Sequence, residues 1–541
     1  MAKFVNSSDS ISASLLLWND LPTQVSIEET YDHNIWPVTN ITNEGPINFN
    51  VPPQPNGLLT DLHIVSKIKI QKDGEDITVP QKDISIVNNL ANSLWGEVSL
   101  VCSDRTELCQ SMKNAYAYQS FFNTALNSAK NREDSLFYNE AFLMDEGKSK
   151  KSEENLRTFW KWDVLKDEYL KTIKFGQESE VETEPLIEQD DTEAVLKNPP
   201  PLQSQVDLEE VKQIMWNATE LEKNNVFELL GVKHSEQIDS IVKEDFLRKI
   251  YGWIPTEANP AASKRSELIN KGQSLTLDSR FQVPLLNTAK CLPTNMKIRI
   301  SLTKNSDDFL LLAKDDSNYS IVIEDVYLRA TYYKVRDEIL RIIEERLKTD
   351  PIPYFISKPE VIIRPVTQAS RIIRINDIFN ENIPPYAFFC LQRSRDFEGR
   401  LKTNPFTFVP FKRFNFYKNG IPYFLDPLEV GTIEEIREGD YAYKDFGHFF
   451  RQLYRTAGKE TKGDCLVDST NFHLNFIVGI SFGADRSSLM DRHLNLQEKA
   501  SSYLEIDLGV ENVPEDLILI TYAVYDRQIQ IDKDRVLRII E

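Results

Sequence analysis

Residues 295–304 read NMKIRISLTK, and the alternation in this stretch decides the fold class. In an extended chain the apolar residues at 296, 298, 300 and 302 point to one side, and the polar residues between them point to the other. A period of two predicts a β-strand with one buried and one solvated face. Such strands are typical of antiparallel sheets that pack on a core with one side only.

The same period recurs along most of the chain. It predicts further strands at 47–51, 62–70, 94–100, 281–286, 321–335, 372–375, 472–482, 504–508 and 517–525. Two strand patterns are followed by Asp73-Gly74 and Asn419-Gly420, dipeptides that suit the two left-handed positions of a type I′ turn. We therefore predict an all-β fold with short hairpins and few helices.

Three segments have helical periodicity instead. Residues 112–126, 336–348 and 441–454 place apolar or aromatic residues on one stripe. We interpret residues 336–350 as a connector helix between a first β domain at 1–335 and a second at 351–541. In each half, strands and a hairpin lead to an aromatic-rich helix and then to more strands, which predicts two related β domains in tandem.

A long insertion at about 128–270 interrupts the first domain, because little strand alternation is found there. Its middle, residues 177–194, holds eight acidic residues and no basic one, and Pro199–Pro201 follow. Such a composition predicts a mobile acidic loop. The flanking stretches 208–230 and 238–250 have helical patterns, so the insertion is also expected to carry a small helical lobe.

Composition excludes several classes of protein. A chain of 541 residues with 41% hydrophobic residues is expected to form two to four globular domains. The formal net charge of −20, from 63 basic and 83 acidic residues, disfavours a nucleic-acid binder. No apolar run is long enough for a membrane span or a signal peptide. Five scattered cysteines (Cys102, Cys109, Cys291, Cys390 and Cys465) are typical of a reducing compartment, so disulfides are not expected.

Catalytic templates find only weak matches. Gly147-Lys148-Ser149 resembles the end of a phosphate-binding loop, but Phe142 occupies the position of the first glycine. Residues 479–483, GISFG, fit the Gly-x-Ser-x-Gly pattern of a nucleophile elbow. The strand alternation continues through Ser481, however, where the elbow needs a sharp turn. We therefore interpret Ser481 as a strand-end serine rather than a nucleophile.

The sequence also shows no convincing match to a metal-binding or ligand-binding pattern. The six histidines are far apart, with His63 and His473 on the polar faces of predicted strands, and the spacing of Cys102 and Cys109 does not suit structural zinc. Glu344 and Glu345 fall on the wet side of the connector helix, and the phenylalanines at 406–416 are spaced to fill a core. The acidic run lacks the spacing of a calcium loop. We predict no catalytic, cofactor-binding or metal-binding residues, and no cofactor.

An ordered set of short motifs resembles the major capsid proteins of Polinton/Maverick elements and adintoviruses. The motifs are Pro46–Phe49, Thr60–Ile64, Lys67–Ile70, Asp73-Gly74, Ile86–Asn89, Ser93–Trp95, Val98–Leu100, Asn114–Tyr118, Phe309–Leu311, Val326–Arg329, Asn404–Phe406 with Phe408, Asn419–Pro422, Tyr525-Asp526 and Ile529–Lys533. They cover nearly the whole chain. The sequence departs from the family in its acidic insertion and at Trp95-Gly96-Glu97, where family members tend to carry Phe and Gln.

The resemblance implies a double jelly roll, that is, two eight-stranded sandwiches side by side. It implies a structural protein rather than an enzyme, with three copies forming a pseudo-hexagonal capsomer. Such capsomers tile an icosahedral shell around a double-stranded DNA genome. The partners it implies are further copies of the chain, a minor vertex (penton) protein and basic internal proteins, with no sequence-specific contact to nucleic acid. The acidic insertion is expected on the outside of the shell.

Two other functions fit the residues as well. A β-sandwich carbohydrate-active or glycan-binding protein would have the same architecture, because one fold hosts many functions. A capsid-derived host protein that now serves another purpose would also retain the same sequence patterns.

Overall fold

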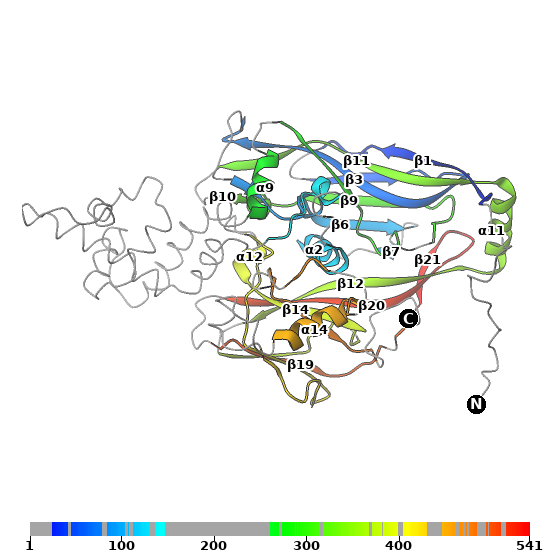
Figure 1. The fold of residues 1–541 in the computed structure, drawn as a ribbon. Coiled ribbons are helices and arrows are strands. Elements are labelled where there is room, and N and C mark those ends of the chain that lie inside the picture. The colour runs from blue at the N-terminus through cyan, green and yellow to red at the C-terminus, as the bar shows by residue number, and fades with distance from the viewer. Residues whose placement is uncertain are drawn as a thin grey trace, which may run out of the picture.

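The computed structural model describes most of the chain on both sides of the insertion. The described residues are 24–41, 45–77, 84–102, 106–107, 112–129, 132, 136–145, 260–269, 273–286, 288, 290–313, 318–366, 371–380, 382–398, 404–429, 446–460, 465–468, 471–472, 475–483, 494–495, 497–509 and 516–540. They form two β-sandwiches that lie side by side, with helix α2 between them and helix α11 at one end (Figure 1).

The first sandwich consists of two antiparallel sheets. Sheet I has the order β1 (Ile27–Ile35), β11 (Tyr319–Val335), β3 (Gly57–Lys72) and β8 (Leu275–Arg280), and β4 (Glu75–Asp76) also pairs with β3. Sheet II has the order β2 (Pro46–Val51), β9 (Ile298–Lys304), β6 (Trp95–Cys102) and β7 (Thr106–Glu107). A short pair, β5 (Ile84–Ile86) with β10 (Leu311–Ala313), lies beside them.

The second sandwich has the same plan. Sheet III has the order β12 (Ile352–Val366), β20 (Leu517–Ile531), β14 (Tyr386–Arg393) and β18 (Val478–Ser481), and β21 (Leu537–Ile540) also pairs with β20. Sheet IV has the order β13 (Ile372–Asn376), β19 (Ser502–Asp507), β15 (Arg413–Lys418) and β16 (Ile421–Pro422), with β17 (Leu428–Glu429) on β15. The predicted all-β fold of two tandem sandwiches is confirmed.

Strand order makes the internal repeat visible. In each half the first strand (β1 or β12) pairs with a long late strand (β11 or β20). That strand pairs with an earlier one (β3 or β14), which in turn pairs with a strand that follows the aromatic helix (β8 or β18). Sheets I and III therefore correspond to each other, as do sheets II and IV. Among the described strands, β1–β11 pair only with one another and β12–β21 do the same.

The described helices fill gaps between and around the sheets. They are α1 (Leu90–Ser93), α2 (Ala115–Asn127), the 3-10 helix η3 (Leu136–Glu140), α9 (Pro260–Ile269), α10 (Asp307–Leu310), α11 (Asp337–Thr349), α12 (Ser394–Glu398) and α14 (Phe446–Thr456). Helix α11 is the predicted connector, with acidic residues in its first turn and Arg346 and Lys348 in its last. None of the described helices is long and apolar enough to span a bilayer.

Both predicted hairpin turns are confirmed. Asp73 and Gly74 have φ angles of 53° and 82°, and the turn joins β3 to β4. Asn419 and Gly420 have φ angles of 51° and 77°, and the turn joins β15 to β16. Two successive left-handed residues define the type I′ turn, which matches the twist of the strands it connects.

Two predicted strands are wrong. Residues 281–286 form turns after β8, although Phe281, Leu285 and Leu286 are buried. Only residues 478–481 of the predicted strand at 472–482 are extended. The described part of 471–477 is turned instead, because the amide of Asn475 donates to the carbonyl of Asn471 at 3.1 Å. Apolar alternation there reflects burial on a turned backbone and not strand pairing.

Both ends of the predicted insertion belong to the core of the first sandwich. Arg265, on α9, is fully buried. Its guanidinium donates to the carbonyls of Ile86 (3.0 Å) and Leu143 (2.6 Å) and to Oδ1 of Asp145 (2.7 Å). Residues 136–145 and 260–269 are thus integral to the sandwich. The predicted acidic loop at 177–194 and the helical stretches at 208–230 and 238–250 lie outside the described residues.

Candidate functional site

The most extensive candidate site is the seam, which we define as α2 together with the second-half residues that it contacts. Helix α2 packs on the outer face of sheet III, the face directed away from sheet IV. The rings of Phe122 and Tyr522 lie 5.2 Å apart, and those of Phe121 and Phe406 lie 4.3 Å apart. These side chains are all buried. Stacked aromatic pairs add to the free energy gained by burying their large apolar surface.

Tyr118 is the polar centre of the seam. Its hydroxyl lies 2.8 Å from Oε1 of Gln392 and 2.9 Å from the carbonyl oxygen of Pro405, so it can donate to either acceptor. The amide nitrogen of Gln392 donates to the same carbonyl. Burial raises the pKa of Tyr118 well above its ordinary value, which keeps the phenol protonated as a donor.

Further hydrogen bonds cross the seam. The backbone amide of Leu466 donates to the carbonyl of Ala125 near the end of α2 at 2.8 Å. The side-chain amide of Asn114, which precedes α2, donates to the carbonyl of Phe397 at 2.9 Å. Asn404 donates to Oδ2 of Asp145 at 2.7 Å, so the buried Arg265–Asp145 pair also contacts the second half. Buried polar groups paired in this way fix the relative position of the two sandwiches.

A separate group of hydrogen bonds joins the two sandwiches to each other near the connector helix α11. Arg535, in the turn between β20 and β21, donates to the carbonyl of Thr294 at 2.9 Å and to Oε1 of Glu344 on α11 at 2.5 Å. The Arg535 hydrogen bond lowers the pKa of Glu344. Glu344 lies on the wet side of α11, with its side chain 39% exposed, but it also accepts hydrogen bonds from Thr294 of the first sandwich and Arg535 of the second, which the sequence did not predict. The two halves are held as one block.

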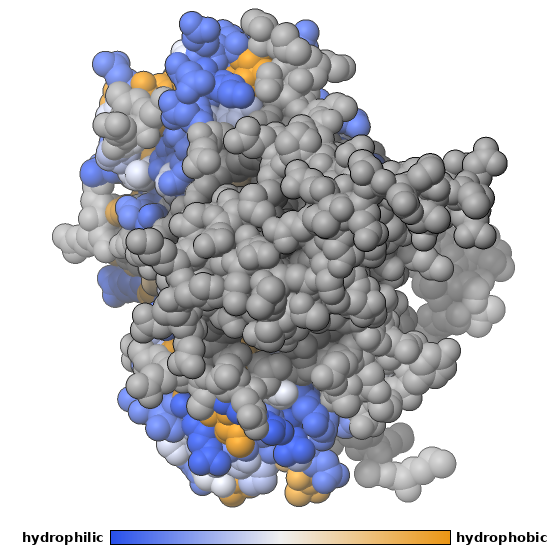
Figure 2. Space-filling view, turned by 90° about the vertical axis from the view of Figure 1, so that its left-hand side faces the viewer, coloured by the Kyte–Doolittle hydropathy of each residue, from blue (hydrophilic) through white to orange (hydrophobic). Residues whose placement is uncertain are grey.

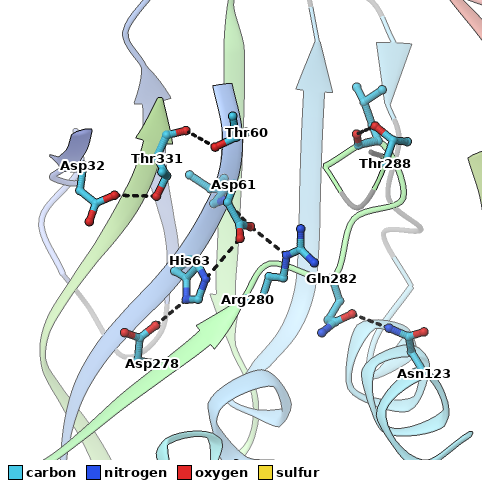
Figure 3. A network of polar contacts seen from close by, with 12 residues as sticks. Asp32, Thr60, Asp61, His63, Asn123, Asp278, Arg280, Gln282, Thr288 and Thr331 are labelled. Atoms are coloured by element: carbon cyan, nitrogen blue, oxygen red, sulfur yellow. Dashed lines mark hydrogen bonds and ion pairs between the residues drawn. The ribbon is translucent and has the colours of Figure 1, made fainter. Parts of the chain in front are cut away.

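A second cluster of polar groups lies on the outer face of sheet I (Figure 3). Nδ1 of His63 is 2.8 Å from Oδ1 of Asp278, and its Nε2 is 3.7 Å from Oδ2 of Asp61. Arg280 pairs with Asp61, and Arg329 pairs with Asp278, each at 2.8 Å. We call these five residues the His63 network. His63 lies on the polar face of its strand, as predicted.

The carboxylates of this network determine the charge of its histidine. Hydrogen bonds to Asp278 and Asp61 raise the pKa of His63 to about 9, so the imidazole is cationic at neutral pH. Glu140 on η3 lies near His63 and Asp278 and is mostly buried. Burial raises the pKa of Glu140 to about 7. Its Oε2 atom is buried without a hydrogen-bond partner among the described residues.

Ser481 is the last residue of β18 and pairs with Tyr386 of β14. Its hydroxyl is buried and has no hydrogen-bond partner in the described part of the chain. Gly479 has a packing role, because a Cβ atom there would lie 2.7 Å from Cβ of Thr456 on α14. The Gly-x-Ser-x-Gly match thus reflects the close approach of a helix to a strand.

The other sequence candidates are dispersed. Phe406, Phe408, Phe411, Phe414 and Phe416 are buried, as predicted for core residues. Cys102, Cys390 and Cys465 are buried and Cys291 is half-buried, and none of these four described cysteines is in a disulfide. No group of three or more metal-ligating side chains occurs among the residues that the structure describes. Lys148, Cys109, His473 and the acidic run lie outside them.

No protein-family model matches this chain, and no curated protein matches it. Several solved structures do match the chain. A chain in the cryo-EM structure of the Sputnik virophage matches with a TM-score of 0.52 and 12% identity, over 100% of this chain and 94% of that one. The Faustovirus major capsid protein matches with a TM-score of 0.52 and 8% identity, over 95% and 92%. The fold is a double jelly roll. The mavirus major capsid protein also matches, with a TM-score of 0.46 and 10% identity, over 100% and 96%.

Sequence patterns missed the seam of this double jelly roll. The stripe on residues 112–126 predicts one buried face on α2, and the spacing of the phenylalanines at 406–416 predicts that they fill a core. Phe406 and Phe408 are buried, but they stack on Phe121 and Phe122 of the first sandwich. The structure buries nearly every residue of α2 from Ala115 to Leu126. The sequence has no clear signal for this, because Gln119, Ser120, Asn123 and Thr124 form a polar stripe that is typical of a helix with one solvated side.

Proposed function

We propose that this protein is a major capsid protein, a structural subunit that assembles with copies of itself into a viral shell. The observation that carries the proposal is the full-length double jelly roll with its buried seam. A fold alone can host many functions. The seam adds a specific reason, because a shell subunit must keep two sandwiches in a fixed relation, whereas a glycan-binding protein has no such need.

The proposed assembly is a homotrimer. Two corresponding sandwiches in each of three copies give six similar units, enough for a pseudo-hexagonal capsomer that tiles an icosahedral shell. The proposed cargo is a double-stranded DNA genome. With a formal net charge of −20, the chain is expected to meet that genome through cationic internal proteins. A minor vertex (penton) protein is the other proposed partner.

We further place the protein with the capsid proteins of Polinton/Maverick elements and adintoviruses. Support comes from where the family-like motifs lie. Asn114–Tyr118 begins the seam helix, and Asn404–Phe406 supplies its opposite wall. The proposed domain bounds are 1–335, 336–350 and 351–541. We place the acidic part of the insertion, residues 177–194, on the shell exterior. Free thiols are in keeping with folding in a reducing host compartment, the cytoplasm or nucleus.

Catalysis is not part of the proposed function. The coloured residues of the face in Figure 2 are mainly hydrophilic, with scattered apolar ones. The glycan-binding alternative has no observation in its favour.

Light scattering coupled to size-exclusion chromatography tests the proposal. We expect a particle of three times 62.5 kDa, and negative-stain images with six-lobed outlines. A protein that stays monomeric at all concentrations, ionic strengths and pH values, while correctly folded, would overturn the proposed function.

A further inference from the structure

We propose that the free edge of β1 binds an extended, basic segment of a partner protein as an added strand of sheet I. The partner is recognised by two properties, a backbone that can continue the sheet and a positive charge. The inference deepens the proposed function, because it names a surface through which cationic internal proteins can bind. Only the source of the basic segment rests on that function, whereas the binding surface follows from the chain itself.

Strand β1 is at the margin of the first sandwich (Figure 1). It pairs with β11 on one side and with no described strand on the other. In an edge strand, alternate residues point their N–H and C=O groups away from the sheet. At Ile27 these two groups bond to the side-chain amide of Gln24, at 3.3 and 3.4 Å. In residues 28–35 the corresponding groups have no partner among the described residues, so they can bond to another strand.

Strand β12 is the counterpart of β1 in sheet III, and its free edge is blocked. Its pairing with β20 runs through all 15 residues without a shift in register, although it contains Pro353, Pro359 and Pro365. The carbonyl of Pro353 accepts a hydrogen bond from Nζ of Lys290 at 2.7 Å, so this residue points its polar groups away from β20. The other two prolines follow at even spacings and therefore have the same direction. Because proline has no N–H, this edge is a poor template for a further strand.

The contrast between these two equivalent strands points to a use for the open edge. Strand β1 contains no proline, and six of its nine residues are exposed. Natural proteins usually protect such an edge, because it otherwise pairs with other chains. The second sandwich accommodates prolines at the same edge, so the fold does not require their absence from β1. The edge of β1 is therefore available to a partner strand.

The side chains of β1 determine which partner fits. Glu28, Glu29 and Asp32 are exposed carboxylates. In the described part of the chain, only Lys334 lies within ion-pair distance of the two glutamates, at 3.6 and 4.0 Å, and its side chain is 45% exposed. Asp32 accepts a hydrogen bond from the hydroxyl of Thr331 at 2.6 Å and has no cationic partner among the described residues (Figure 3). Three carboxylates and one lysine leave this edge acidic.

An acidic edge selects a basic partner strand. Pairing of β1 with β1 of a second copy brings like charges together, which is unfavourable. Neighbouring strands lie about 4.8 Å apart, so lysine or arginine side chains of an added strand can reach the carboxylates. Backbone hydrogen bonds then supply affinity and the charges supply selectivity, in a contact that weakens as salt is added.

Peptide binding to the full chain tests the inference. The probe is a fluorescent peptide of about ten residues in which lysine and threonine alternate, a pattern that favours an extended, basic strand. The control is the same peptide methylated at every backbone nitrogen, which keeps the charge but has no N–H to donate. Fluorescence anisotropy is expected to show binding of the first peptide that weakens with added salt, and a Kd at least about tenfold higher for the second.

Hydrogen exchange locates the bound peptide. The unmethylated peptide should slow amide exchange in residues 27–35, because the outward N–H groups of β1 gain partners. Residues 352–366 should exchange at an unchanged rate, since the prolines block the corresponding edge of β12.

A charge-neutralised variant provides an independent measurement. Removing the three carboxylates of β1 is expected to raise the Kd of the peptide about tenfold, since each exposed charge pair contributes a fraction of a kcal/mol. A matched control changes the net charge equally at exposed positions on and beside α11, and should leave the Kd unchanged. The test variant combines Glu28→Gln, Glu29→Gln and Asp32→Asn, and the control combines Glu338→Gln, Glu345→Gln and Asp350→Asn.

The outcomes separate the inference from the proposed function. Equal binding of the two peptides, equal effects of the two variants, or protection outside residues 27–35 would show attraction by charge alone and overturn the inference. A chain that forms the trimer in light scattering but binds no peptide also overturns it, while the proposed function stands. Peptide binding at β1 by a chain that stays monomeric supports the added strand and contradicts the proposed function.

Discussion

The ring of Phe121, from the first jelly roll, lies parallel to the ring of Phe406, from the second, with centroids 4.3 Å apart and an angle of 4° between their planes. Both side chains are almost fully buried, at 1% exposure. The pair shows how the two halves are joined: the contact is as deeply buried as the core of either sandwich. A molecule joined in this way is expected to unfold as one unit.

The first prediction concerns that cooperativity. Phe121→Ala should lower the free energy of unfolding by about 3–5 kcal/mol, because it leaves a cavity in the seam. It should also separate the denaturation of the two halves, giving two transitions in urea where the wild type gives one. Phe414→Ala, a change in the core of the second sandwich, should cost a similar amount but keep a single transition. Two transitions in both variants would contradict a special role for the seam.

The second prediction concerns the buried Arg265–Asp145 pair. Arg265→Met should lower the free energy of unfolding by about 3–5 kcal/mol, because it removes the cationic partner of the buried Asp145 carboxylate. Arg280→Met is the matched control, since its ion pair with Asp61 is largely exposed. That variant should change the free energy of unfolding by less than about 1 kcal/mol. Thermal and urea denaturation measure both. Equal losses would show that α9 is not part of the core.

The third prediction concerns pH and His63. Its pKa rises from 6.5 to about 9 on folding, so its stabilising contribution is fully present below pH 6.5 and is lost as the pH rises through about 9. Urea denaturation from pH 6 to pH 10 should show this decline. His63→Asn should flatten the profile in that range, whereas a change of the exposed His33 to Asn should not. An unaltered profile in the His63 variant would show that the network does not stabilise the fold.

The fourth prediction concerns Glu140. Burial raises its pKa from 4.5 to about 7, so the folded state favours the protonated carboxyl. Stability should fall as the pH rises from 4.5 to about 7, because ionisation of a buried group without a hydrogen-bond partner at Oε2 is unfavourable. Glu140→Gln should therefore stabilise the protein at pH 8 and have little effect at pH 4. Destabilisation at pH 8 would indicate that the carboxylate has a partner.

The fifth prediction separates Gly479 from Ser481. Gly479→Ala should lower the free energy of unfolding by about 1–3 kcal/mol, because the added Cβ would meet Thr456 at 2.7 Å. Ser481→Ala should be neutral or slightly stabilising, since the buried hydroxyl has no hydrogen-bond partner among the described residues. Denaturation measures both. A larger loss from the serine change would point to a role of the hydroxyl.

How much of this structure the sequence predicts depends on how far apart along the chain the interacting residues are. Strand β9 and the Asp73-Gly74 turn follow from neighbouring residues, because side-chain alternation and backbone conformation are local properties. The strand predicted at 472–482 failed because alternation records burial and not strand pairing. In the described part of 471–475 the side chains are buried on a turned backbone, which the pattern does not distinguish from a strand.

The sites were harder to predict than the strands. The stacking of Phe121 on Phe406 and the pairing of Arg265 with Asp145 join residues that are far apart in sequence. Each residue type was compatible with several surroundings: phenylalanine with the core of either sandwich, and arginine with solvent. Only the packing of the two complete sandwiches determines which of these surroundings each residue has. His63 was placed correctly on the polar face of its strand, but its carboxylate partner Asp278 comes from a strand 215 positions away.

Asp145 and Arg265 are 120 positions apart in the sequence, yet their side chains are in direct contact within the first sandwich. The two ends of the segment between them therefore lie at the same place in the sandwich, tied together by a buried ion pair. When the two ends of a segment are held together, a change in its length alters the entropy cost of folding only slightly, because that cost grows with the logarithm of the length. This position is consequently an insertion site, at which evolution or protein engineering can exchange one segment for another without displacing any strand.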